Sequence, residues 1–104
     1  DAGWPAGVDA GLLTSPQERE LLKAVATFPE TVARAAREAE PSIVSRYVLD
    51  LSGLFSSYWA ATKDEGIVGD DRALSTARIA LVEAVRRVLG KGLMLLGLRL
   101  VDEM

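Results

Sequence analysis

Apolar residues recur at intervals of three and four positions through the last third of the chain, and this spacing limits the fold more than any other feature of the sequence. No stretch of the chain alternates for long enough with the period of two that marks a β-strand. The pattern therefore predicts a long amphipathic helix beginning near Arg72, with an inward stripe formed by Leu74, Ala77, Leu81, Ala84, Val85 and Val88.

Three further helices are predicted upstream. Ser15-Pro16-Gln17-Glu18 has the form of a capping box with proline at the first helical position, and it opens a helix. That helix ends near Phe28, because Pro29 disfavours helical backbone at the residue before it, and Pro29 then begins a second helix. The third runs from about residue 41 to residue 61 and has the clearest stripe: Val44, Tyr47, Val48, Leu51, Leu54, Phe55 and Tyr58.

Glycine positions set the remaining boundaries. Asp70 or Asp71 is expected to cap the last long helix, and Gly90 and Gly92 are expected to end it near residue 89. Residues 1–13 should form an irregular lead-in, because glycine and proline interrupt every period. We therefore predict that residues 1–104 form a single all-α domain, a small bundle of four main helices plus a short C-terminal helix.

Charge is distributed unevenly along the chain. Between Arg72 and Arg99, six lysines and arginines accompany one acid, Glu83, whereas the rest of the chain holds six basic and fourteen acidic residues. The net charge of -3 is unlike that of a strongly basic nucleic-acid-binding domain, so any contact with nucleic acid depends on this local excess. No apolar run approaches the roughly 20 residues that span a bilayer, so we expect no membrane partner. The absence of cysteine suits a cytoplasmic protein.

Residues that carry chemistry are scarce. The chain has no histidine, no cysteine and no phosphate-binding glycine loop, and Ser56-Ser57 has no base at helical spacing. The acidic residues of the loop (Asp64, Glu65, Asp70 and Asp71) could in principle hold Mg²⁺ or Ca²⁺, but their spacing matches no calcium loop and favours solvated acids. We expect no catalytic residue, metal or cofactor in this chain.

Three blocks of sequence occur in an order that is more specific than any of them alone. They are Glu20-Leu21-Leu22 with Phe28-Pro29-Glu30; Arg46-Tyr47-Val48-Leu49-Asp50-Leu51; and the stretch from Arg72 through Gly90-Lys91-Gly92-Leu93-Met94-Leu95-Leu96-Gly97-Leu98 to Met104. Together they resemble the C-terminal part of bacterial-type arginyl-tRNA synthetases, the DALR anticodon-binding domain. The resemblance covers roughly residues 12–104.

This resemblance implies a helical surface that receives the anticodon stem-loop of tRNA-Arg. It also implies a monomeric parent enzyme in which ATP (with Mg²⁺), arginine and the acceptor end bind to a separate catalytic domain of the same polypeptide. In the family, an aromatic residue late in the third helix and the terminal methionine contact the anticodon loop, and these positions fall at Trp59 and Met104. Tryptophan replaces the more usual tyrosine and keeps a stacking face.

The chain departs from the family in two places. Glu103 stands where the family commonly has an arginine, which removes a partner for phosphate near the tail. The family's opening helix, with its tyrosine, alanine, histidine and arginine, has no counterpart before Trp4. We therefore expect residues 1–104 to be a fragment that lacks this first helix.

The residues themselves leave alternatives at each candidate position. Trp59 falls outside the apolar stripe, so it either stacks on an RNA base or packs against Met104 or the lead-in. Arg78 lies close to the stripe and either pairs internally with an acid such as Asp50 or contacts RNA. Cations near a helix C-terminus are favoured for structural reasons alone, yet they are also candidates for contact with the RNA backbone: Arg86, Arg87 and Lys91.

A second function from another class is also consistent with the sequence. The C-terminal residues are more apolar than a short helix requires, and they could form the interface of a helical protein-interaction module with no RNA-binding role. These residues are Leu93, Met94, Leu95, Leu96, Leu98, Leu100 and Val101.

Overall fold

The computed structural model describes residues 4–5, 7–62 and 71–103, with residues 99–103 described by their backbone alone. A 3-10 turn, η1 (Ala10–Leu12), precedes four helices: α1 (Pro16–Ala26), α2 (Phe28–Arg37), α3 (Ser42–Thr62) and α4 (Arg72–Glu103). None of the described residues lies in a β-strand. The predicted all-α class with four main helices is confirmed.

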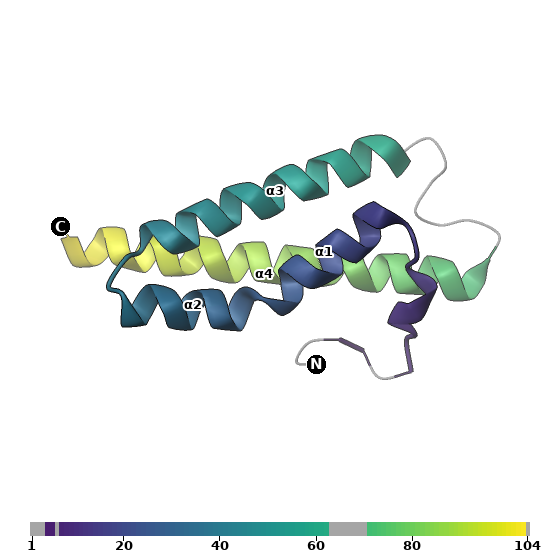
Figure 1. The fold of residues 1–104 in the computed structure, drawn as a ribbon, viewed down its shortest axis with the longest axis horizontal. Helices are drawn as coiled ribbons and strands as arrows, with labels where there is room; N and C mark the ends of the chain where they lie inside the picture. The colour runs from purple at the N-terminus through teal and green to yellow at the C-terminus, as the bar shows by residue number, and fades with distance from the viewer. Residues whose placement is uncertain (1–3, 6, 63–70, 104) are drawn as a thin grey trace.

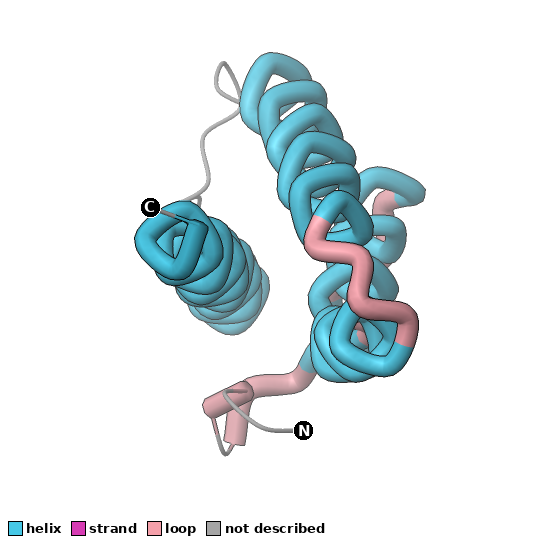
Figure 2. The backbone as a smooth tube through the Cα atoms, turned by 90° about the vertical axis from the view of Figure 1, so that its left-hand side faces the viewer, coloured by secondary structure: helices cyan, strands magenta, loops and turns pink. Residues whose placement is uncertain are grey.

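The helices form an elongated bundle with extents of 50 × 27 × 20 Å. α3 and α4 run antiparallel along its length. α1 and α2 follow one another in the direction of α4 and lie in front of it (Figure 1). Seen from the end, α4 lies on one side, with α3 and the α1–α2 pair facing it (Figure 2). Of the helices described, none is long and apolar enough to cross a membrane.

The predicted helix caps are present. The Ser15 hydroxyl accepts a hydrogen bond from the Glu18 N–H at 3.1 Å, and the Glu18 carboxylate accepts one from the Ser15 N–H at 3.3 Å, which completes the capping box. At the start of α4, the Asp71 carboxylate accepts from the Leu74 N–H at 3.1 Å. The sequence therefore defines where α1 and α4 begin.

The core lies where α1, α3 and α4 meet. Its fully buried side chains include Leu13, Leu21, Leu51, Tyr58, Leu81 and Val85. The lead-in covers part of this core: the half-buried Trp4 packs against it, and the indole N–H of Trp4 donates to the carbonyl of Val8 at 2.9 Å. The lead-in tryptophan is thus a packing residue.

The predicted break at Gly90 and Gly92 is wrong, because α4 continues without interruption to Glu103. Gly92 is buried against α3, and a Cβ atom added there would lie 2.6 Å from Cγ2 of Val48. This glycine lets two helices approach closely and does not cap one of them. Beyond it, Leu95 and Leu96 pack against the other helices, and tertiary packing of this kind sustains a helix despite glycine's weak propensity. There is accordingly no separate short C-terminal helix.

Candidate nucleic-acid interface

Trp59 presents a large aromatic surface to solvent near the end of α3. Its side chain is 48% exposed, whereas that of the preceding residue, Tyr58, is fully buried. The Phe55 ring lies one turn earlier, with its centroid 6.3 Å from that of Trp59 and a 30° angle between the two planes. The indole is therefore supported by a second ring and keeps an accessible face.

The helical spacing places Trp59 on the edge of α3 that borders α4. Val48, Ser52, Phe55 and Trp59 follow one another at steps of four, three and four residues, so they share one edge of the helix. Val48 is the residue that contacts Gly92 of α4. The edge that carries Trp59 thus continues the edge that packs against α4 at Val48.

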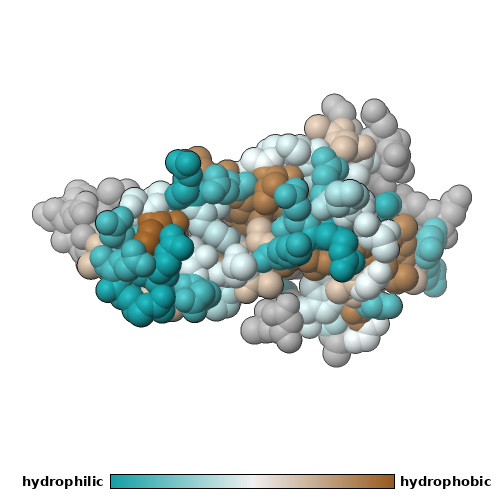
Figure 3. Space-filling model, in the orientation of Figure 1, coloured by the Kyte–Doolittle hydropathy of each residue, from teal (hydrophilic) through white to brown (hydrophobic). Residues whose placement is uncertain are grey.

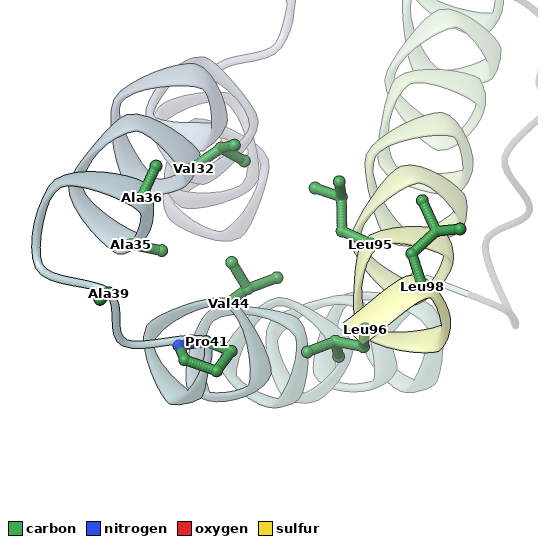
Figure 4. Close-up of a pocket in the computed structure, with 9 residues that line it drawn as sticks. All are labelled: Val32, Ala35, Ala36, Ala39, Pro41, Val44, Leu95, Leu96 and Leu98. Carbon is green, nitrogen blue, oxygen red and sulfur yellow. The ribbon is translucent and has the colours of Figure 1, made fainter. Parts of the chain in front are cut away.

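Three cations of α4 were predicted to contact the RNA backbone, and they lie on two different edges of the helix: Arg86, Arg87 and Lys91. Figure 4 shows Leu96 pointing towards α3 and Leu95 pointing towards α2. At 100° per residue, Arg86 lies about 80° around the helix axis from Leu96, whereas Arg87 and Lys91 lie about 80° and about 40° from Leu95. Arg86 consequently borders α3, whereas Arg87 and Lys91 lie towards α2.

Trp59 and Arg86 lie at neighbouring levels along the axis of the bundle. The contact between Val48 and Gly92 fixes the antiparallel register of α3 and α4, and it sets Trp59 about five residues from Arg86, or about 8 Å along the axes. We call the strip between them the α3–α4 seam; it consists of Ser52, Phe55 and Trp59 from α3 with Val82 and Arg86 from α4. The seam combines an aromatic face, a hydroxyl and a guanidinium.

Glu83 organises the charges beside the seam. Its carboxylate accepts hydrogen bonds from Nε of Arg86 at 2.9 Å and from Nε of Arg87 at 3.3 Å. The hydrogen bond from Arg86 is the main reason that the pKa of Glu83 lies below its ordinary value, and the same carboxylate raises the pKa of Arg86. One carboxylate faces two guanidiniums, so this exposed group keeps an excess of positive charge.

The charges on the outer face of α2 are more nearly balanced. Figure 3 shows this face as largely hydrophilic. Arg34 pairs with Glu38 at 3.8 Å and Arg37 pairs with Glu30 at 3.2 Å, and all four side chains are exposed. Because each cation there has its own acid, the excess of positive charge among these described elements lies on α4.

Arg78 is part of the interior. Its Nε donates to the Glu18 carboxylate at 3.0 Å, and the side chains of Arg78 and Glu18 are 20% and 2% exposed. Of the two alternatives for Arg78, the structure shows the internal ion pair, with Glu18 as the acid; Asp50 instead pairs with Arg46 on the surface at 3.8 Å. We exclude Arg78 from the candidate interface.

Glu18 also accepts a hydrogen bond from the Tyr58 hydroxyl at 2.9 Å. Burial disfavours the charged carboxylate and would by itself raise its pKa, but the hydrogen bonds from Tyr58, Ser15 and Arg78 outweigh burial and lower it. Burial, together with the adjacent Glu18 carboxylate, raises the pKa of Tyr58. At neutral pH this cluster therefore holds a charged carboxylate, a neutral phenol and a guanidinium.

Sequence reasoning assigned Glu18 to helix capping and missed this interior role. A signal was nevertheless present, because Glu18 precedes Leu21 by three residues and Leu22 by four, which places it on the inward stripe of α1. A charge on such a stripe needs a buried partner. Arg78, close to the stripe of α4, is the complementary charge.

Met104 lies outside the described residues. The backbone of α4 runs to Glu103 at the end of the bundle away from the end of α3 (Figure 1). From the level of Trp59 to Glu103 there are roughly 20 helical residues, or about 30 Å. The last described residue of α4 is therefore remote from the seam.

An apolar cleft of about 340 Å³ opens between α2, the start of α3 and the last part of α4 (Figure 4). It has only aliphatic side chains in its lining: Val32, Ala35, Ala36, Ala39, Pro41, Val44, Leu95, Leu96 and Leu98. None of these side chains offers a polar group to a nucleotide. Leu93 and Met94, which belong to the same predicted apolar surface, are 59% exposed, whereas the side chains of Leu100 and Val101 are not described.

Of the acids considered as metal ligands, Asp64, Glu65 and Asp70 lie outside the described residues, and Asp71 caps α4. In the part of the chain that the structure describes, acidic residues form no group of three that could hold a metal ion.

Comparison with protein families gives the class to which this helical bundle belongs, that of anticodon-binding domains. The match covers residues 4–104, all but three residues of the chain. The chain belongs to the family described as the DALR anticodon binding domain. The resemblance seen in the sequence is thereby confirmed.

The chain is similar to part of several arginine–tRNA ligases. It is 44% identical to the enzyme of Pediococcus pentosaceus over 88% of the chain and 16% of the relative. It is 39% identical to that of Desulfitobacterium hafniense over 99% of the chain and 18% of the relative, and 37% identical to that of Nitrosomonas europaea over 95% and 16%. The chain thus spans less than a fifth of the length of these relatives. No solved structure is detectably similar to it.

Proposed function

We propose that this chain is the anticodon-binding module of an arginine–tRNA ligase and that the α3–α4 seam receives the anticodon loop of tRNA-Arg. Membership of an anticodon-binding family and similarity to arginine–tRNA ligases support the proposal. The observation that carries it is the half-exposed indole of Trp59, which projects from α3 while α4 carries the local excess of cations.

The residue chemistry of the seam suits an unpaired base. Proteins hold single-stranded bases by stacking them on aromatic rings, and they hold the backbone through arginine and lysine. In this proposal one loop base stacks on Trp59 and Arg86 pairs with an adjacent phosphate. Arg87 and Lys91, on the other edge of α4, contact the backbone further along the RNA.

Met104 remains a proposed second contact with the RNA. Because α4 places Glu103 about 30 Å from the level of Trp59, we propose that Met104 meets a different part of the stem-loop from the base on Trp59. Met104→Ala should then weaken binding independently of Trp59→Ala.

We propose that the remaining four-fifths of the parent enzyme carries out ligation. Residues outside this chain would bind ATP with Mg²⁺, arginine and the acceptor end of the tRNA, and would supply the family's opening helix. This chain would contribute recognition of tRNA in cis, within a monomeric parent. By itself it should join no amino acid to tRNA.

The test is binding of a fluorescently labelled tRNA-Arg anticodon stem-loop, measured by anisotropy. Trp59→Ala should weaken binding by about 1–3 kcal/mol if one base stacks on the indole. Far-UV circular dichroism of the variant should match that of the original chain, because the indole is half exposed and lies outside the core.

Leu98→Ala is a matched control, because Leu98 is similarly exposed (57%) but lines the apolar cleft. It should leave RNA affinity unchanged. Unaltered affinity in a folded Trp59→Ala protein would contradict the proposal. A chain that binds no stem-loop, yet binds another part of the parent enzyme through Leu98, would instead be the interaction module considered from the sequence.

A further inference from the structure

The Glu18 carboxylate joins three helices at one buried point. It belongs to α1, where one of its oxygens accepts the Ser15 N–H at 3.3 Å. Its other oxygen accepts the hydroxyl of Tyr58 from α3 at 2.9 Å and Nε of Arg78 from α4 at 3.0 Å. A single side chain that is 2% exposed therefore ties α3 and α4 to the same atom of α1.

This junction lies directly behind the proposed RNA-binding seam. Tyr58 and Trp59 are consecutive in α3 and point about 100° apart, so a Tyr58 held inside the bundle turns Trp59 towards the outside. On α4, Arg78 precedes Val82 by one turn and Arg86 by two turns. Both sides of the seam thus have an anchor to Glu18 within about two turns.

Hydrogen bonds at this junction can fix the rotation of α3 about its axis, which apolar packing alone does not fix. Leu51 and Leu81 bury area nearby, but contact between aliphatic side chains has no preferred direction. The Tyr58 hydroxyl and the Arg78 guanidinium both need specific geometry to reach the carboxylate. If α3 rotated about its axis, it would lose the hydrogen bond from Tyr58 and would carry Trp59 with it.

We infer that Glu18 is a positioning residue for the RNA-binding seam. Through Tyr58 and Arg78 it sets the rotation of α3 and its register against α4, so that the Trp59 indole is held facing outward. This role rests on the proposed function. It assigns the preorganisation of the RNA-binding surface to the buried Glu18 and Tyr58 and the partly buried Arg78.

The experiment measures the orientation of Trp59 and RNA affinity separately. The chain is prepared with Trp4→Phe and with 5-fluorotryptophan, so that Trp59 gives the single ¹⁹F resonance. Tyr58→Phe removes only the hydroxyl that Glu18 accepts. It should broaden or split the resonance and weaken stem-loop binding by about threefold to tenfold, while the circular dichroism spectrum stays helical.

A double-mutant cycle distinguishes positioning from a general loss of structure. In a Trp59→Ala background, Tyr58→Phe should cause little further loss of affinity, because the ring that it orients is already gone. An equal loss of affinity in both backgrounds would mean that Tyr58 supports the fold alone, and it would overturn the inference.

Tyr47→Phe is the matched control. Tyr47 also lies on α3 and its hydroxyl also donates to α1, to the carbonyl of Ala24, but it lies three turns away from Trp59. It should change neither the ¹⁹F resonance nor RNA affinity. A resonance unchanged by Tyr58→Phe would overturn the positioning role, whereas unchanged affinity in Trp59→Ala would overturn the proposed RNA face itself.

Discussion

At the scale of single residues, Glu18 shows how position decides what a charged side chain does. The neighbouring Glu20 is exposed on α1, whereas Glu18 is enclosed and accepts hydrogen bonds from three other residues. A carboxylate buried in this way is unfavourable unless its partners are all present. Removing its charge should therefore be far more costly than removing the charge of Glu20.

Glu18→Gln should lower the free energy of unfolding by about 2–4 kcal/mol at pH 7, because the amide leaves Arg78 without a charged partner. The folded-state pKa of Glu18 is lowered, so its ionised form contributes stability above the unfolded-state pKa and loses it as pH falls through the folded value. The difference between the two proteins should accordingly shrink from pH 7 to pH 3. Urea unfolding at both values measures this.

Glu20→Gln provides the comparison, with an expected change within about 0.5 kcal/mol at either pH. If Glu18→Gln and Glu20→Gln have the same effect at neutral pH, the buried hydrogen bonds of Glu18 add nothing to stability.

At the scale of elements, α4 shows why two glycines in one helix have opposite consequences. A Cβ atom at Gly90 would have no neighbour within 4 Å, whereas a Cβ atom at Gly92 would lie 2.6 Å from Val48. Valine in a helix has one strongly preferred rotamer, so the side chain of Val48 cannot turn away at low cost. The two positions therefore separate helix propensity from helix packing.

Gly90→Ala should raise the free energy of unfolding by about 0.5–1 kcal/mol, because alanine loses less backbone entropy than glycine in a helix. Gly92→Ala should lower it by about 1–2 kcal/mol, since the clash outweighs the same gain. Guanidinium unfolding followed by circular dichroism measures both variants. Stabilisation by Gly92→Ala would show that α3 and α4 pack less closely than described.

The starts of α1, α2 and α4 could be predicted from local signals to within one residue, whereas the end of α4 could not. Ser15, Pro29 and Asp71 act on neighbouring backbone, so sequence alone locates them. Gly90-Lys91-Gly92 predicts a helix end because glycine commonly follows the last residue of a helix. Glycine also occurs where two helices pack closely, and only the position of Val48 in α3 shows that Gly92 has this second role. Helical spacing within α3 was enough to place Trp59 outside the core. The seam and the separation of Arg86 from Arg87 depend on how α3 and α4 pack together, so spacing within one helix could not predict them.

At the scale of the whole molecule, electrostatic attraction for RNA must come from the cations of α4 and not from the net charge. The chain carries a net charge of -3, so its overall field repels a polyanion, while α4 holds the excess of cations. Three phosphate contacts, from Arg86, Arg87 and Lys91, should make the logarithm of the binding constant fall with the logarithm of salt concentration with a slope of about -2.

Arg86→Gln should reduce the size of that slope by roughly 0.7, the contribution expected of one phosphate contact to a single strand. Affinities measured by anisotropy across a series of potassium chloride concentrations give the slope. Arg34→Gln removes another exposed arginine, 55% exposed against 70% for Arg86, from α2 and should leave the slope unchanged. Equal slopes for the original chain and Arg86→Gln would place Arg86 outside the RNA contact.

The capping box of α1 has a consequence for how the bundle opens. The first turn of a helix ordinarily frays ahead of the rest, but here the carboxylate that holds this turn also holds two distant helices. Unwinding that extends to Glu18 therefore also breaks its hydrogen bonds with α3 and α4. The N-terminal end of α1 should exchange its amide protons as slowly as the deepest part of the protein.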